Sequence, residues 1–267
     1  MLKDITLGQY FPGDSVVHKL DPRTKLLMVV LYIAALFLAE GAVGYAVMVA
    51  VTVLFVGLSK VPPKALFKGL KPVFIIIVLT AVLNMFGTEG TVLVQVWKLT
   101  LTEEGLVRAL FMVLRVVMLI CGTFLLTYTT APVALTDGME LLLNPLKKLK
   151  VPVHEMSMMM SMALRFIPTL IEETDKIMSA QKARGADFET GSLIDRAKAL
   201  LPILVPLFVS AFRRADELAI AMESRCYNGG AGRTRMKQLR FAAGDYLALL
   251  FGVALNAGMI GLQVMGV

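Results

Sequence analysis

The sequence is poor in the residues that build metal sites and disulfide frameworks. It contains only two cysteines and two histidines among 267 residues. Cys121 lies in an apolar run and Cys226 in a polar stretch that we expect in the cytosol, which excludes a disulfide framework. His18 and His154 have no His, Cys or carboxylate at ligand spacing, so we expect structural roles for both. We predict that the chain has no metal site and no bound cofactor and that it is not an enzyme.

Charged residues are also scarce. They make up 18% of the chain, against 57% hydrophobic residues and a mean hydropathy of +0.73, whereas soluble domains are about 25% charged and about 45–50% apolar. The composition predicts a polytopic membrane protein. A net charge of +7 fits basic loops that set orientation on anionic lipid better than nucleic-acid binding.

A cleaved signal peptide and a nucleotide-binding loop are both missing. The first 24 residues are polar and have no apolar core, so insertion depends on the first membrane helix. The glycine-rich residues Gly229 to Thr234 have no preceding strand, Lys-Ser/Thr pair or following helix, and we interpret them as a flexible loop.

Apolar runs predict an all-α bundle of about five membrane spans. The runs cover 26–39, 42–58, 72–86, 104–130 and 242–264. Asp21 is the expected N-cap of the first helix, with Pro22 at its first position. The first two runs form either a tight hairpin, which we favour, or one long buried helix with a kink. We divide the chain into a cytosolic N-terminal segment (1–24), membrane helices 1–4 (25–130), a cytosolic coupling region (131–240) and a last membrane helix (241–267).

Charge asymmetry predicts the orientation. Residues 60–71 form an expected loop with lysines and no acidic residue (Lys60, Lys64, Lys68 and Lys71), so we place it in the cytosol. Residues 88–104 carry acidic side chains and one tryptophan that suit the outer surface (Glu89, Trp97, Glu103 and Glu104). The N-terminus is then inside and the C-terminus outside.

Two features of the spans remain open to interpretation. Arg108 and Arg115, seven residues apart on one helical face, either belong to a pathway or partner contact, or lie at the outer edge of a span that begins at Val116; the second interpretation avoids burying charge. The last span has a small-residue surface for close helix packing, which includes Gly252 and Gly258.

Two long amphipathic helical patterns dominate the coupling region. The first extends from about Val153 to Arg184 and the second from about Leu201 to Arg225, and a short helix is expected at 137–150. We call the two long patterns the arms. They superpose with an offset of 41 residues, which aligns Arg184 with Arg225.

Each arm ends in an arginine between two small residues. We predict docking sites for partner proteins at these tips (Ala183, Arg184, Gly185, Ser224, Arg225 and Cys226). Small neighbours leave the guanidinium accessible, and its planar fork of donors suits carboxylates or carbonyls.

The chain resembles the transmembrane T component of energy-coupling factor (ECF) transporters along nearly its whole length. The resemblance rests on four blocks: 20–25 (LDPRTK), 164–168 (LRFIP), 183–185 (ARG) and 223–227 (ESRCY). The family's paired motif is Ala-Arg-Gly; the first copy matches, and the second departs from it at Ser224 and Cys226.

The resemblance implies a subunit that couples two cytosolic ABC-type ATPases, which bind ATP, to a small membrane-embedded substrate-binding (S) subunit that imports vitamins or transition-metal ions. The resemblance also implies a place in a prokaryotic cell membrane. The arms of such subunits cross beneath the membrane with their arginine ends in grooves of the ATPases. Two other interpretations stay open. A stand-alone permease needs polar residues inside its spans, for which Asn84 and Asn256 are candidates, and a membrane-embedded lipid enzyme needs clustered acids such as Asp137 and Glu140.

Overall fold

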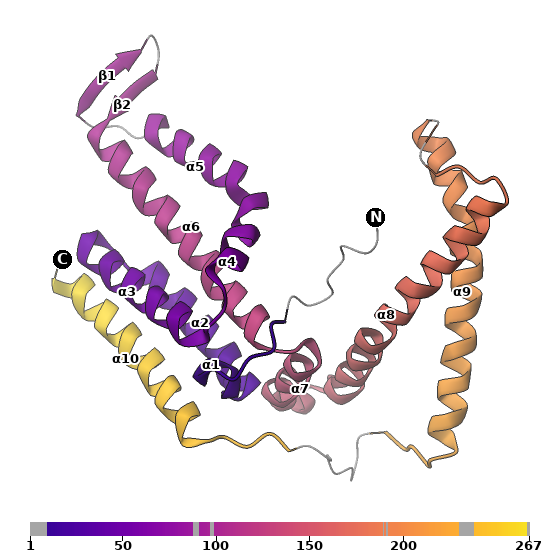
Figure 1. Ribbon diagram of the computed structural model, residues 1–267. Coiled ribbons are helices and arrows are strands. Elements are labelled where there is room, and N and C mark those ends of the chain that lie inside the picture. Colours follow the sequence, from indigo (N-terminus) through magenta and orange to yellow (C-terminus); the bar gives the residue numbers. More distant parts are fainter. Residues whose placement is uncertain are drawn as a thin grey trace. The chain divides into compact units, whose positions relative to one another are not determined.

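The computed structural model describes residues 10–87, 91–96, 99–188, 190, 192–229 and 238–265. These residues are mostly helical, which confirms the predicted all-α fold (Figure 1). The chain separates into two compact units. One, which we call the membrane unit, comprises Gly8–Leu142 and Gln238–Val267, and the other, the arm unit, contains Leu143–Lys237.

The membrane unit contains most of the helices. In chain order they are α1 (Val16–Lys19), α2 (Pro22–Leu38), α3 (Gly41–Ser59), α4 (Pro63–Leu70), the 3-10 helix η2 (Lys71–Val73), α5 (Phe74–Gly87), α6 (Glu103–Thr129), α7 (Pro132–Leu143) and α10 (Ala243–Met265). Among the described residues, four helical segments are long and apolar enough to cross a membrane: Gly41–Ser59, Pro63–Gly87, Glu103–Thr129 and Ala243–Met265. The remaining predicted span, residues 26–39, corresponds to α2, whose 17 residues extend about 25 Å, so the count of five stays a prediction.

Helix α2 packs against α3, α6 and α10. Its buried side chains Tyr32, Ala35 and Leu36 form the core together with Met48 of α3 and Met118 of α6. The Tyr32 hydroxyl lies 2.7 Å from Oγ1 of Thr52. A buried hydroxyl with a partner avoids the cost of an unpaired polar group, so this contact fixes α2 against α3.

The predicted hairpin of the first two spans is present. Asp21 caps α2 by accepting a hydrogen bond from the Arg23 backbone, and Pro22 occupies the first helical position, as expected. Helix α2 ends at Leu38 and α3 begins at Gly41, whose positive φ of 65° favours glycine.

Two segments predicted as loops are ordered elements instead. The lysine-rich segment folds into α4, because Pro63 starts a helix that buries Leu66 while Lys64 and Lys68 stay exposed. The acidic segment contains strands β1 (Val92–Val96) and β2 (Leu99–Thr102), which pair antiparallel. Their valine and threonine residues favour strands. Glu89 and Trp97 lie outside the described residues.

Helix α6 begins well before Val116, the residue at which the outer-edge interpretation of Arg108 and Arg115 starts the span. It begins at Glu103, where Thr102 caps it by accepting from the Gly105 backbone, so both Arg108 and Arg115 lie within the helix. Nη2 of Arg115 donates a 3.2 Å hydrogen bond to the Ala39 carbonyl. Arg115 therefore lies level with the turn that joins α2 to α3.

The arm unit consists of two helices of equal length. Helices α8 (Val153–Ala183) and α9 (Leu193–Glu223) each have 31 residues, and a 3-10 helix η3 (Asn144–Leu149) precedes them. The first arm matches its predicted extent. The second begins eight residues earlier than expected, because Ser192 and Asp195 form a reciprocal capping box and the helix continues through Pro202. The short helix expected at 137–150 is divided between α7 and η3.

Candidate functional site

Each arm helix ends within two residues of its arginine. Helix α8 ends at Ala183 with Arg184 as its C-cap, and α9 ends at Glu223 with Ser224 as its C-cap. All six residues predicted for the tips are exposed: Ala183, Arg184, Gly185, Ser224, Arg225 and Cys226. Both guanidinium groups are thus accessible from solvent.

The backbone that presents each arginine is also equivalent. The residue after each arginine is left-handed, with φ of 87° at Gly185 and 55° at Cys226. The next amide then bonds back five residues, from Ala186 to the Gln181 carbonyl at 3.0 Å and from Tyr227 to the Met222 carbonyl at 3.1 Å. This is the Schellman arrangement of a helix C-terminus.

The shared turn geometry explains how the second arm accommodates a motif that differs from Ala-Arg-Gly. Cys226 adopts the left-handed backbone that Gly185 adopts in the first copy, although that conformation costs a residue with a Cβ roughly 1–2 kcal/mol. Each cap satisfies helix-end carbonyls and leaves the arginine beside the negative end of the helix dipole. Each tip therefore presents one exposed cation on a fixed turn, which suits an anionic or carbonyl-lined groove.

The arms contact each other through equivalent positions. Nη2 of Arg214 in α9 donates a 2.7 Å hydrogen bond to Oε2 of Glu173 in α8. Hydrogen bonding from Ser210 and the charge of Arg214 hold the pKa of Glu173 below its ordinary value, although desolvation raises it. These two residues are 41 apart, the same offset that aligns the two tips. The sequence prediction does not include Glu173 and Arg214, although the 41-residue repeat places them at equivalent positions.

The arms also expose apolar side chains. On α9, Phe208, Phe212 and Ile220 are 61%, 69% and 64% exposed. On α8, Met156, Met159 and Met160 are about half exposed. Exposed apolar surface of this extent is typical of an interaction surface.

Other candidate residues make structural contacts. The His18 ring bonds to Oγ of Ser15 at 2.6 Å and to the Phe11 carbonyl at 2.9 Å, which confirms the structural role expected for it. Nδ2 of Asn256 donates to the Leu31 and Gly252 carbonyls. In the described part of the chain, no three His, Cys, Asp or Glu residues are grouped as metal ligands.

These features define a helical membrane protein with a pair of long arm helices that end in exposed arginines. A family model described as CbiQ, cobalt transport protein, matches residues 13–237. The chain is 57% identical over 257 residues to the energy-coupling factor transporter transmembrane protein EcfT of Clostridium kluyveri, a match that covers 96% of this chain and 95% of that protein.

Further relatives agree over the same length. The EcfT proteins of Thermosediminibacter oceani and Bacillus subtilis are 54% and 51% identical, over 97% and 96% of this chain and 98% and 97% of their own. The chain belongs to this family, the transmembrane T components of ECF transporters. Its relatives are named as transporter components rather than as enzymes.

Proposed function

We propose that the chain is the coupling subunit of an ECF-type importer. It transmits ATP-driven movement of two cytosolic ATPases to a membrane-embedded S subunit, which takes up a vitamin or a transition-metal ion. The observation that carries the proposal is the matched pair of exposed arginines, Arg184 and Arg225, on equivalent C-terminal turns. Two equivalent tips fit a pair of related partners.

In this proposal the arms serve both kinds of partner. The tips dock in grooves of the ATPases, which bind the ATP, so the chain itself needs no cofactor. The exposed apolar residues of α8 and α9, such as Met159 and Phe212, are available to the S subunit. The arm unit and the N-terminus lie on the cytoplasmic side, an orientation that the exposed lysines of α4 support.

Removal of the two guanidinium groups tests the docking role. Truncating one partner of a buried charged hydrogen bond costs about 2–5 kcal/mol, which weakens docking by roughly tenfold to several thousandfold. We expect Arg184→Ala or Arg225→Ala to reduce ATPase binding only in part, because the second contact keeps the effective concentration high. The double change should release the ATPases, and lysine should restore binding incompletely because it lacks the planar fork.

The measurement is the amount of ATPase subunit that copurifies with the affinity-tagged chain from its native membrane. Arg213→Ala is the matched control, since it removes an exposed arginine of α9 that lies away from the tip. The proposal fails if the double variant retains as much ATPase as this control.

A further inference from the structure

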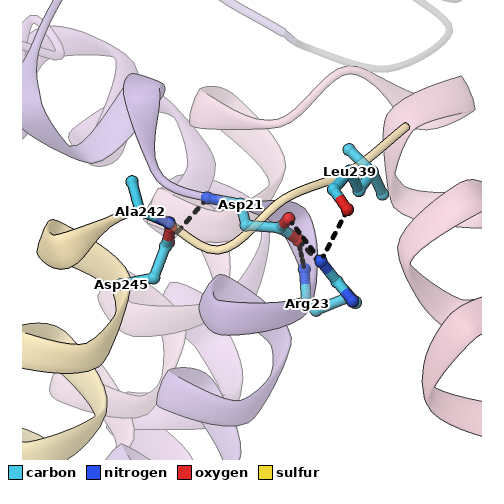
Figure 2. Close-up of polar contacts among 5 residues, drawn as sticks. All are labelled: Asp21, Arg23, Leu239, Ala242 and Asp245. Atoms are coloured by element: carbon cyan, nitrogen blue, oxygen red, sulfur yellow. Dashed lines mark hydrogen bonds and ion pairs between the residues drawn. The ribbon is translucent and has the colours of Figure 1, made fainter. Parts of the chain in front are cut away.

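The first turn of α2 carries a group of polar contacts that the docking role does not use. We call Asp21, Pro22 and Arg23 the anchor turn. Nε and Nη2 of Arg23 donate to the two carboxylate oxygens of Asp21 at 3.0 and 2.9 Å. Nη2 also donates to the Leu239 carbonyl at 3.2 Å (Figure 2). The guanidinium lies 4.0 Å from the centre of the Phe241 ring. Arg23 thereby holds the segment through which the chain leaves the arm unit.

Asp245 completes this connection from the other side. Its carboxylate accepts hydrogen bonds of 2.8 Å from the backbone amides of Asp21 and Ala242 (Figure 2). The residue is only 2% exposed, and a buried carboxylate needs such partners. One side chain of α10 therefore joins the anchor turn to residue 242.

The segment through which the chain reaches the arm unit packs on the same turn. Helix α7 directly precedes that unit, and its Gly138 lies so close that an added Cβ would meet Cβ of Pro22 at 3.0 Å and the Arg23 nitrogen at 3.3 Å. A Cβ at this position would be crowded, so glycine favours the close approach. Both covalent connections of the arm unit, α7 and residues 238–242, thus meet the anchor turn.

Electrostatics strengthen the arrangement. Burial raises the pKa of Asp21, but hydrogen bonds from Arg23 and the charges of Arg23 and Lys25 outweigh it, so this pKa lies below its ordinary value. Nζ of Lys25 also donates to the Thr129 carbonyl at 2.8 Å, which fastens the end of α6 to the same helix turn.

We propose that the anchor turn is the element through which movement of the arm unit reaches the membrane unit, with Arg23 and Asp245 as its positioning residues. This inference rests on the proposed function. Because the chain enters and leaves the arm unit beside one turn, a displacement of the arms acts on the start of α2 and α10 together. Without Arg23, residues 238–241 lose their direct tie to α2 and can shift while α2 stays in place.

Hydrogen exchange of the full complex, purified with its copurifying ATPases, tests the inference with ATP and vanadate as the probe. In the unaltered chain we expect ATP to change exchange in α8 and α9 and also at residues 20–25 and 239–246. In Arg23→Ala the response of the arms should persist. The response at 20–25 and 239–246 should disappear, and basal exchange at 239–242 should rise about tenfold, as expected when a hydrogen bond to a charged group is removed.

Matched variants separate positioning from general damage. Arg240→Ala removes an exposed arginine of the same segment, which bonds to the Gln238 side chain at 3.4 Å, and this variant should behave as the unaltered chain. Arg23→Lys should recover part of the response, because an ammonium keeps one donor but not the fork. Gly138→Ala, which crowds the anchor turn, should weaken the response at residues 20–25 and 239–246. If Arg23→Ala does not assemble, an unchanged response in Gly138→Ala overturns the inference.

Each outcome has a defined meaning. If the arms of the unaltered complex do not respond to ATP, the proposed function and this inference both fail. If the arms respond but residues 20–25 and 239–246 do not, or if their response persists in Arg23→Ala, only the inference is overturned. If Arg240→Ala abolishes the response as Arg23→Ala does, the effect is not due to the anchor turn, and the inference is again overturned.

Discussion

Arg115 offers the sharpest test of how the membrane unit is held together. Its guanidinium donates to the Ala39 carbonyl at the end of α2 and lies 5.7 and 5.5 Å from the ring centres of Phe37 and Tyr45. Tyr45 in turn stacks on Phe111 at 4.6 Å. One side chain of α6 therefore contacts both helices of the α2–α3 hairpin, and we predict that Arg115→Ala loosens it.

The expected destabilisation follows from the interactions that the Arg115 guanidinium makes. A hydrogen bond made by a charged donor contributes about 1.5–3 kcal/mol, and each cation–π interaction contributes about 0.5–1 kcal/mol. The sum is about 2.5–5 kcal/mol of unfolding free energy. For a chain of this size, 1 kcal/mol corresponds to roughly 2–4 °C in Tm, so the midpoint should fall by at least about 5 °C. Arg115→Lys should be less destabilising, because an ammonium retains the donor but not the planar stacking.

Thermal unfolding of the purified chain in detergent measures this effect. Arg108→Ala is the matched control, because Arg108 lies on the same helix seven residues earlier and is exposed. Its unfolding free energy should stay within about 0.5 kcal/mol of that of the unaltered chain. If Arg115→Ala unfolds at the same temperature as the control, the stabilising role is refuted. A fall in transport without a fall in Tm would instead favour the pathway or partner contact.

Two further predictions concern the last helix and the orientation. Gly252→Leu should destabilise the chain by about 1–3 kcal/mol, because even an added Cβ would meet Met28 and Leu31 of α2 within 3 Å. Gly258→Leu should leave Tm unchanged, because Gly258 has no described neighbour within 4 Å. Equal Tm values for the two variants would contradict this packing. A cysteine at Lys64 should react with an impermeant label only after the membrane is opened, and one at Glu40 should react in intact cells; the reverse pattern would overturn the orientation.

Local rules account for what the sequence reveals. The cap of α2 by Asp21 and the turn after α2 follow from residues that are neighbours in the chain. The predicted start of α9 is wrong because Pro202 and Pro206 resemble helix boundaries, whereas the capping box of Ser192 and Asp195 sets the true start and the helix tolerates both prolines. Propensity also explains why the expected outer loop forms a hairpin of strands.

Long-range contacts lie beyond such rules. The bond between Asp245 and the Asp21 amide joins residues 224 positions apart, and that between Lys25 and Thr129 joins residues 104 apart. An acid at the start of an apolar helix signals that Asp245 has a partner, since an unpaired buried charge is costly. Nothing in the sequence identifies which backbone amides donate to it, because packing of separate helices decides it.

The contact between the arms shows where a repeat does predict a long-range pair. Glu173 and Arg214 are equivalent positions, and each lies 11 residues before the arginine of its own tip. At 1.5 Å per residue, each tip is about 16 Å along its helix from the contact. The two arms therefore meet at the same distance along each helix from its own tip.

Charge reversal tests whether this contact joins the arms. Arg214→Glu places two carboxylates together, and their repulsion should raise hydrogen exchange at residues 170–176 and 211–217. Arg213→Glu makes the same change of charge at the neighbouring exposed position and should have little effect. Adding Glu173→Arg to Arg214→Glu restores an ion pair of reversed polarity, and exchange should return toward that of the unaltered chain. If the double variant exchanges as fast as Arg214→Glu, the single effect arises from damage to α9, and the arms do not depend on this pair to stay in contact.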